Sequence, residues 1–354
     1  MDPNAEIKDE SNSPEPPFLE REPTEEEFER SRNPPLRYTE FCQLRSHEKP
    51  ISVVRFSPDG NLLASGSLDR CFRIWRTSTA EECAEKAIVN AHRECGLNDF
   101  NFKADSSQVV TCFDDGSART FDLESGQRIQ KLEGHCAKVI TACFNPHGNA
   151  VATASFDRTT KIWDLRSGEA VRTLLGHTQV LTSAGFNYDG SQLCTSSLDG
   201  LVHLWDMASG HCIRTILGGG DETKGVPCMA ARFAPDGRHV LASKLDNTVY
   251  LVDSKEAAIL RRYTNHLHGR FFLTPDFSIV PSGTYIVCGS EDGRVFVWDA
   301  DSEEVVFVFR DDFKSEGVVR SVSCHPSKEI IAFCEGTLVR VWYGGFEPKK
   351  EECE

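Results

Sequence analysis

The sequence has few basic residues for its acidic content, no apolar run long enough to span a membrane and no cysteine pair spaced as C-x-x-C. Its 39 Lys and Arg stand against 54 Asp and Glu, a net charge of −15, whereas a binder of nucleic acid or anionic membrane needs clustered positive charge. The first residues (MDPNAEIKDE) also lack the basic and apolar regions of a secretory signal. We therefore expect an intracellular protein that does not contact nucleic acid or membrane directly.

Metal and cofactor sites are also not indicated. The fourteen cysteines are scattered, which favours reduced, mostly buried apolar side chains over a zinc site or a disulfide framework. His266 and His268 stand at strand-like spacing without Cys or carboxylate companions, so no metal site is predicted. The segment 218–225 (GGGDETKG) lacks the order G-x-x-x-x-G-K-[ST] of a phosphate-binding loop and is expected to be an ordinary loop. No cofactor is expected.

Residues 1–36 differ in composition from the rest of the chain. They contain eleven acidic and four basic side chains and seven of the sixteen prolines. Such a segment buries too little apolar surface to offset its ordering entropy, so a disordered tail is predicted. It is either a solubilising leader or a docking arm carried by Phe18 and Phe28. Residues 346–354 are expected to form a short disordered C-terminal tail, and residues 37–345 the folded domain.

The folded part of the sequence is repetitive. Seven segments end in an aromatic or apolar residue at intervals of 42 to 47 residues, namely Trp75, Phe121, Trp163, Trp205, Val252, Trp298 and Trp342. An Asp stands six residues before each of the first six, at Asp69, Asp115, Asp157, Asp199, Asp246 and Asp292. Turn sequences such as FSPDG (56–60) separate strand-like runs within each repeat. The pattern predicts an all-β, seven-bladed WD-repeat β-propeller.

The last repeat is incomplete in sequence. Almost no chain is left after Trp342 for a fourth strand, whereas YTEFCQL (38–44) precedes the first full repeat and alternates like a strand. We therefore predict that the N-terminal strand pairs with the last blade and closes the ring.

Three repeats contain a complete set of His, Ser or Thr, Asp and Trp. The sets are His47, Ser65, Asp69 and Trp75; His135, Thr153, Asp157 and Trp163; and His177, Thr195, Asp199 and Trp205. The residue types match a catalytic triad, but the same spacing recurs in each repeat, and an enzyme does not need three copies. A chain from indole to hydroxyl to imidazole to carboxylate would satisfy every buried polar group. We interpret the sets as structural and predict no catalytic residue.

The repeats resemble the WD-repeat family. The shared motifs are Gly-His at 134–135 and 176–177 and Trp-Asp at 163–164, 205–206 and 298–299. A narrower similarity, to the WD-repeat-5-type adaptors of COMPASS/MLL histone methyltransferase complexes, is carried by residues 186–217, 233–253, 286–299 and 323–332. It implies a non-catalytic, nuclear scaffold that acts as an adaptor of a histone H3 lysine-4 methyltransferase complex. Such an adaptor is a monomer within a larger complex and binds peptides of the other subunits or of a histone tail.

The resemblance also implies a peptide site at one mouth of the central channel. In that family two phenylalanines hold the guanidinium of an arginine-containing peptide, and Ile140 and Thr274 stand at their positions here. Because each aromatic face contributes about 0.5 to 2 kcal/mol, we expect arginine binding to be weakened by about one to two orders of magnitude or more. The other matched positions are Ser52, Leu68, Asn98, Asp114, Phe156, Thr182, Leu198, Phe271 and Phe272. Phe272 would supply one clamp face if the strand register shifts.

A second partner groove is implied on the opposite face, where the family binds an acidic and aliphatic segment of another subunit. Its matched positions are Asp236, His239, Leu251, Arg261 and Ile279. For both surfaces the alternative is that these are ordinary rim residues of a propeller with other partners.

Two alternative functions remain open. Trp163-Asp164-Leu165-Arg166 resembles the WDxR docking box of substrate receptors for cullin-type ubiquitin ligases, although Arg166 would equally be a solvated residue after a repeat. The chain could also be a generic WD-repeat scaffold in another complex.

Overall fold

A computed structural model describes residues 38–45, 47–79, 82–218, 223–309 and 317–344. The two predicted tails, with Phe18 and Phe28, lie outside these residues, as does part of the glycine-rich segment 218–225. Within the described ranges there is no helix of a length and apolarity that would cross a membrane.

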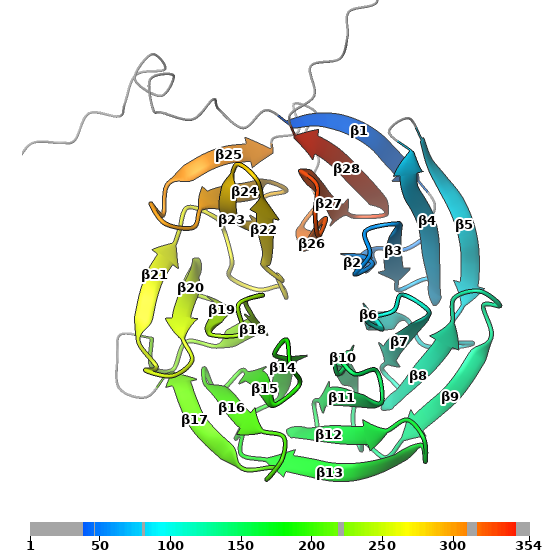
Figure 1. The fold of residues 1–354 in the computed structure, drawn as a ribbon, viewed down its shortest axis with the longest axis vertical. Helices are drawn as coiled ribbons and strands as arrows, with labels where there is room; N and C mark the ends of the chain where they lie inside the picture. The colour runs from blue at the N-terminus through cyan, green and yellow to red at the C-terminus, as the bar shows by residue number, and fades with distance from the viewer. Residues whose placement is uncertain (1–37, 46, 80–81, 219–222, 310–316, 345–354) are drawn as a thin grey trace, which may run out of the picture. The chain divides into compact units, whose positions relative to one another are not determined.

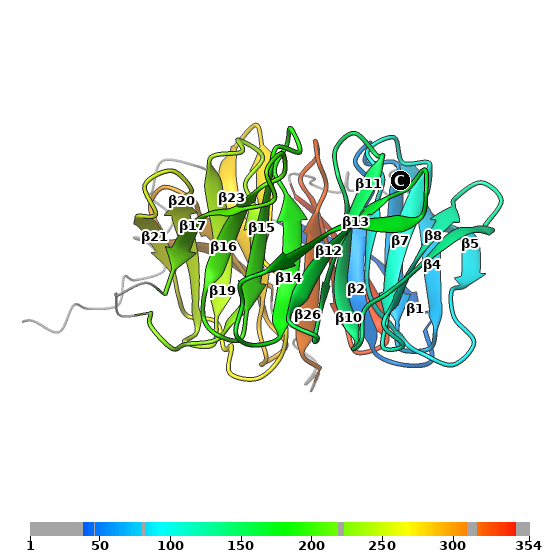
Figure 2. The ribbon, with the colours of Figure 1, turned by 90° about the horizontal axis from the view of Figure 1, so that it is seen from below.

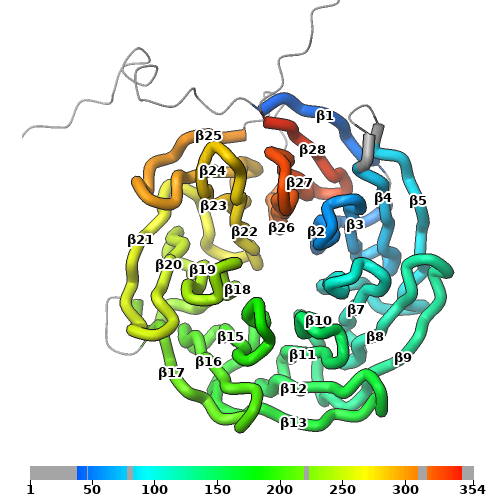
Figure 3. Tube along the Cα trace, in the orientation of Figure 1, coloured from blue at the N-terminus to red at the C-terminus, as the bar shows by residue number. Residues whose placement is uncertain are grey.

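Seven four-stranded antiparallel sheets are arranged around a central axis (Figure 1). Figure 2 shows the strands from the side, and Figure 3 shows that the chain builds most blades in turn from the channel outward. The described residues contain 28 strands and no helix. The predicted all-β, seven-bladed propeller is therefore confirmed.

In each blade the first of the four strands borders the channel and the last lies at the outer rim (Figure 1). Blades one to four consist of β2 (Ile51–Phe56), β3 (Leu62–Ser67), β4 (Cys71–Thr79) and β5 (Glu82–Asn90); β6 (Leu97–Phe102), β7 (Gln108–Phe113), β8 (Ser117–Asp122) and β9 (Arg128–Glu133); β10 (Val139–Phe144), β11 (Ala150–Ser155), β12 (Thr159–Asp164) and β13 (Glu169–Leu175); and β14 (Leu181–Phe186), β15 (Gln192–Ser197), β16 (Val202–Asp206) and β17 (Cys212–Leu217). Blades five to seven consist of β18 (Cys228–Phe233), β19 (His239–Lys244), β20 (Thr248–Asp253) and β21 (Ile259–Tyr263); β22 (Asp276–Val280), β23 (Gly283–Gly289), β24 (Val295–Asp299) and β25 (Val305–Phe309); and β26 (Val319–Cys324), β27 (Ile330–Glu335), β28 (Leu338–Gly344) and β1 (Tyr38–Arg45).

The hydrophobic core lies between neighbouring blades. The middle strands are buried on both faces, as in β3 (LLASGS), and their small and apolar side chains pack against the next sheet. Trp75 of blade one, for example, belongs to one apolar cluster with Ile330 and Val341 of blade seven. Each blade therefore depends on its neighbours for burial, as in other repeat architectures.

The ring is closed by the N-terminal strand, as predicted. β1 pairs with β28 in antiparallel register from Tyr38↔Gly344 to Arg45↔Leu338, with one irregularity between Glu40 and Cys42. Tyr38 is only 6% exposed. Its ring lies 5.2 and 5.0 Å from those of Phe307 and Phe309 in blade six.

A second closing contact joins blade seven to blade one at the turn that contains Gly60. Gly60 has φ of 73°, and a Cβ atom there would lie 2.5 Å from the His325 ring. His325 Nε2 contacts the Gly60 carbonyl at 3.1 Å, while its Nδ1 accepts the N–H groups of Ser327 and Lys328. Glycine is required here by both the left-handed backbone and the close approach of the ring.

Candidate protein-interaction site at the channel mouth

The polar set of blade three forms a continuous hydrogen-bonded chain. The Trp163 indole N–H donates to Thr153 Oγ1 at 2.8 Å, and Thr153 Oγ1 lies 2.7 Å from His135 Nε2. His135 Nδ1 in turn lies 2.7 Å from an oxygen of Asp157. The chain is complete when the hydroxyl donates to Nε2 and the Nδ1–H donates to the carboxylate, which is the neutral form of the imidazole.

Blade four repeats this arrangement and blade one does so in part. Blade four has distances of 2.8, 2.9 and 3.0 Å along Trp205, Thr195, His177 and Asp199. In blade one His47 contacts Ser65 at 2.6 Å and Asp69 at 2.7 Å. No hydrogen bond from Trp75 to Ser65 occurs among the described residues, so that part of the prediction is wrong. The Trp75 ring instead packs edge-on against His47 and into the core shared with blade seven.

Solvent does not reach the histidines of these sets. The side chains of His47, His135 and His177 are 0%, 1% and 2% exposed. Burial lowers the pKa of His47 and of His135 below the usual value, although the neighbouring carboxylates act in the opposite direction. Both ring nitrogens of each histidine are engaged within its set, so we interpret the sets as contacts that hold strands together.

Replacing Thr153 by Val is expected to lower the free energy of unfolding by about 2 to 6 kcal/mol, because two buried groups each lose a partner at about 1 to 3 kcal/mol. Urea unfolding followed by tryptophan fluorescence measures the change. Thr173→Val is the matched control, since Thr173 lies on the exposed side of the same blade. Equal effects of the two substitutions would contradict the structural role.

The remaining blades replace the set by other contacts. In blade two, His92 Nε2 contacts Asp115 at 2.8 Å, and in blade six the Trp298 indole donates to the Thr264 carbonyl at 3.0 Å. His266 is 1% exposed, and its ring nitrogens have no hydrogen-bond partner in the described part of the chain. Among the described residues, no group of three or more His, Cys, Asp or Glu is placed to hold a metal ion.

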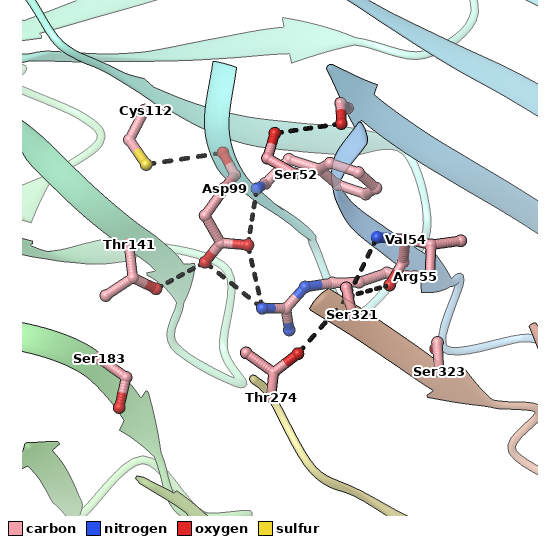
Figure 4. Close-up of polar contacts among 12 residues, drawn as sticks. Ser52, Val54, Arg55, Asp99, Cys112, Thr141, Ser183, Thr274, Ser321 and Ser323 are labelled. Atoms are coloured by element: carbon pink, nitrogen blue, oxygen red, sulfur yellow. Dashed lines mark hydrogen bonds and ion pairs between the residues drawn. The ribbon is translucent and has the colours of Figure 1, made fainter. Parts of the chain in front are cut away.

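The channel itself is lined by polar side chains of the innermost strands (Figure 4). Arg55 Nη2 donates to both carboxylate oxygens of Asp99 at 3.1 and 3.3 Å, and the Thr141 hydroxyl donates to the same carboxylate at 2.6 Å. Burial alone would lower the pKa of Arg55, but the Asp99 charge raises it above the usual value. Arg232 pairs with Asp276 at 2.6 Å in the same way. The charges inside the channel are therefore matched.

Eight of the predicted mouth residues occupy two equivalent positions in successive blades. Four are the second residues of innermost strands, namely Ser52, Asn98, Ile140 and Thr182. The other four follow directly after the second strand of a blade, namely Leu68, Asp114, Phe156 and Leu198. Seven of the eight are half-buried or exposed, and Thr182 is 4% exposed. The repeat therefore brings these residues to the same end of the channel.

Asp114 is held by neighbours at the mouth. Its carboxylate accepts hydrogen bonds from Lys138 at 2.6 Å and from the side-chain amide of Asn98 at 2.9 Å. Ser52 and Thr182 donate to backbone carbonyls of the next blade, at Leu97 and Cys228. These hydrogen bonds hold the rim side chains in place.

Blade six supplies the other mouth residues from the segment before β22. Phe271 is half-buried, and the guanidinium groups of Arg320 and Arg270 lie 5.0 and 5.6 Å from its ring centroid. Phe272 is 37% exposed. The Thr274 N–H donates to the Arg320 carbonyl at 3.2 Å, and its hydroxyl lies 3.5 Å from that of Ser321. An aromatic ring and a guanidinium are thus already stacked at this mouth within the protein.

The predicted second groove is brought together only in part. Leu251 and Arg261 are partners on β20 and β21, and Asp236 hydrogen bonds to His239. Ile279 is 46% exposed on β22 of the next blade. Arg261 lies 3.7 Å from Glu303 of blade six, an ion pair that the sequence did not suggest. Partner binding at this groove stays a prediction.

The WDxR residues lie at the outer side of blade three. Asp164, Leu165 and Arg166 line an open pocket of about 320 Å³ together with residues of blade two, and Arg166 is exposed. Arg166 would be exposed both as a docking residue and as an ordinary solvated residue, so its exposure does not distinguish the two. Docking to a ligase stays a prediction.

Comparison with known proteins gives the family. A model described as the WDR5 beta-propeller domain matches residues 43–343. This chain belongs to that family. The match covers all seven blades apart from the first residues of β1 and the last residue of β28.

Individual relatives match shorter segments. The chain is 28% identical over 142 residues to mouse Jouberin, 30% over 118 residues to human WD repeat domain-containing protein 83, and 33% over 103 residues to coatomer subunit beta'-2 of Arabidopsis thaliana. These segments are 38%, 33% and 28% of this chain and only 13%, 36% and 11% of the relatives. WD-repeat propellers of this kind are typically non-catalytic interaction scaffolds.

Three further residues occupy positions equivalent to those of the predicted mouth residues in the WDR5-type propeller. Arg320 and Met229 are the second residues of β26 and β18, equivalent to Ser52 in β2. Leu245 is equivalent to Leu198, because each N–H donates to the residue just before an innermost strand. An alignment of the seven innermost strands would have found all three. The resemblance to the family indicated only the positions of a site already known in that family.

Proposed function

We propose that this chain is a scaffold that holds a peptide segment of a partner protein at the channel mouth, as an adaptor subunit of a nuclear, COMPASS-like histone H3 lysine-4 methyltransferase complex. The scaffold role is supported by the contrast between the polar sets inside the blades and the side chains at the channel mouth. The repeated His, Ser or Thr and Asp sets are buried and bonded to each other, whereas the mouth collects half-buried side chains from most blades.

The methyltransferase complex is proposed on family membership, since the WDR5-type match extends through the whole ring. The mouth departs from the family at the clamp, because Ile140 and Thr274 present no aromatic face. A partner peptide is therefore held by other side chains of the rim, and the groove near Leu251 and Arg261 contributes a second attachment.

Affinity purification of the tagged full-length chain, with mass spectrometry of co-eluting proteins and nuclear fractionation, tests the proposal. We expect methyltransferase-complex subunits to co-elute from the nuclear fraction. Thr173→Val serves as an intact control, and Leu68→Asp and Leu198→Asp place charge on the mouth without touching the blade sets. If both mouth variants retained every partner, the partners would have to bind at another surface. Absence of methyltransferase subunits would reject the adaptor role.

A further inference from the structure

Arg320 occupies an unusual position among the arginines of this protein. It is the second residue of β26, next to the fully buried Val319, and its guanidinium lies over the Phe271 ring at 5.0 Å. Stacking on an aromatic face holds a guanidinium in place while leaving the N–H groups at its edge available. The side chain is half-buried at the channel mouth.

Other arginines with similar burial all have an acceptor. Eight arginines of the described residues are buried or half-buried, and seven of them contact a carboxylate or a carbonyl oxygen, namely Arg55, Arg73, Arg119, Arg172, Arg261, Arg294 and Arg340. Arg320 is the eighth, and its side chain has neither an ion pair nor a hydrogen bond within the described ranges. A partly desolvated cation without an acceptor is costly unless a ligand supplies one.

A second guanidinium lies at the same ring. Arg270 is 5.6 Å from the Phe271 centroid and likewise has no side-chain acceptor among the residues described. Its position is fixed by Glu291, whose Oε1 accepts the backbone N–H groups of Gly269, Arg270 and Phe271 at 2.9, 2.6 and 2.8 Å. This carboxylate therefore organises the loop and does not form an ion pair with either guanidinium in the described part of the chain.

Several other charges at this end of the channel and inside it are paired within the described part of the chain. Asp114 holds Lys138 at 2.6 Å, and deeper in the channel Asp99 and Asp276 hold Arg55 and Arg232. The protein as a whole carries a net charge of −15, which repels anions in general. An anion would therefore be attracted only locally, where the Arg320 and Arg270 guanidinium groups lie against the Phe271 ring.

We infer that the channel mouth binds an oxyanion side chain of a partner peptide through Arg320 and Arg270, stacked on Phe271. The inference rests on the proposed peptide-binding function of the mouth. It assigns to the mouth an anionic peptide side chain in place of the cationic arginine side chain that the family binds. The planar edge of each guanidinium matches two oxygens of a carboxylate or a phosphate. The oxyanion comes either from Asp or Glu or from a phosphorylated side chain.

Four degenerate peptide pools, identical except for a central glutamate, phosphoserine, serine or arginine, test the inference by fluorescence anisotropy with the full-length chain. The expected result is that the glutamate or phosphoserine pool binds about 10 to 100 times more tightly than the serine pool, as hydrogen bonds to charged groups provide. A preference for phosphoserine over glutamate identifies a phosphorylated partner, and equal affinity identifies an acidic one.

Variants assign the effect to the two arginines. Arg320→Gln and Arg270→Gln are each expected to reduce the anionic preference about tenfold, and Arg320→Lys to retain part of it, because lysine keeps the charge without the planar fork. Arg214→Gln, at an exposed arginine of β17, is the matched control and leaves the preference unchanged. An unchanged melting temperature shows that each variant is folded.

The outcomes separate this inference from the proposed function. Equal binding of the serine and anionic pools, or an anionic preference that survives both arginine substitutions, overturns the inference while peptide binding stands. Preference for the arginine pool overturns it in favour of a clamp that selects a cation. Absence of binding by any pool overturns both.

Discussion

Replacing Tyr38 by Ala is expected to lower the free energy of unfolding by about 3 to 5 kcal/mol, the usual cost of deleting a buried aromatic ring. The ring is 6% exposed and lies against Phe307 and Phe309 of blade six, although Tyr38 itself begins the outer strand of blade seven. It therefore holds two blades and the closing strand together. Denaturant unfolding at equilibrium gives the change directly.

Two substitutions control for this effect. Thr39 is the next residue of β1 and is exposed, so Thr39→Ala is expected to change the free energy of unfolding by less than about 0.5 kcal/mol. Tyr38→Phe keeps the ring and removes a hydroxyl that is buried and has no hydrogen-bond partner within the described ranges, so no loss is expected. Deleting residues 38–44 removes the whole β1–β28 ladder and is expected to destabilise the ring more than Tyr38→Ala does. An unchanged melting temperature after that deletion would reject closure by β1.

The fold could be predicted because the physical causes of a blade are local and repeated. Turn residues such as those at 56–60, the alternation of apolar residues and the Asp six positions before each blade end recur every 42 to 47 residues. Closure by β1 also followed from sequence, since blade seven lacked a fourth strand and residues 38–44 had no other partner. Contacts such as that between Gly60 and His325 could not be foreseen, because they join residues 265 positions apart.

The mouth was less predictable than the fold. Repeat register alone places Ser52 and Asn98 at the same end of the channel, so these positions could be anticipated. The stacking of Arg320 on Phe271 depends on how the segment before β22 runs, and Glu291 fixes that segment through three backbone hydrogen bonds. Such a loop conformation has no periodic signature in the sequence.

Acidification from pH 7 to pH 4 is expected to destabilise the propeller through its buried histidines. His203 is 7% exposed and stacks on His177 with 4.2 Å between ring centroids. Burial, and then the charge of His177, lower the pKa of His203 to about 4. The His266 ring packs edge-on against Trp298 of blade six and has no hydrogen-bond partner among the residues described, and burial followed by the charge of His268 lowers its pKa to about 4 as well.

The sign of the effect follows from linkage. The pKa values of the folded protein lie below the unfolded value of about 6.5, so the unfolded chain takes up protons first as the pH falls. Stability is complete above about pH 6.5, is lost progressively toward pH 4 and levels off below it. At about 1.4 kcal/mol per pKa unit, each of the two histidines removes about 3 kcal/mol at the end of this range. Asp115 takes up its proton at a lower pH than these histidines. Burial would raise the pKa of Asp115, but hydrogen bonds from Ser117 and His92 outweigh burial and lower it to about 2.

Urea unfolding at pH 7, 5.5 and 4 measures the loss, and His203→Gln tests its origin. The variant is expected to lose about 3 kcal/mol less than the parent protein between pH 7 and 4, because glutamine has no proton to bind in this range. His211→Gln, at an exposed histidine of the same blade, is the matched control and is expected to keep the parent pH profile. If His203→Gln lost as much stability on acidification as the parent, other groups would have to carry the pH dependence. A smaller loss would show that burial of His203 against His177 makes blade four one acid-sensitive part of the ring.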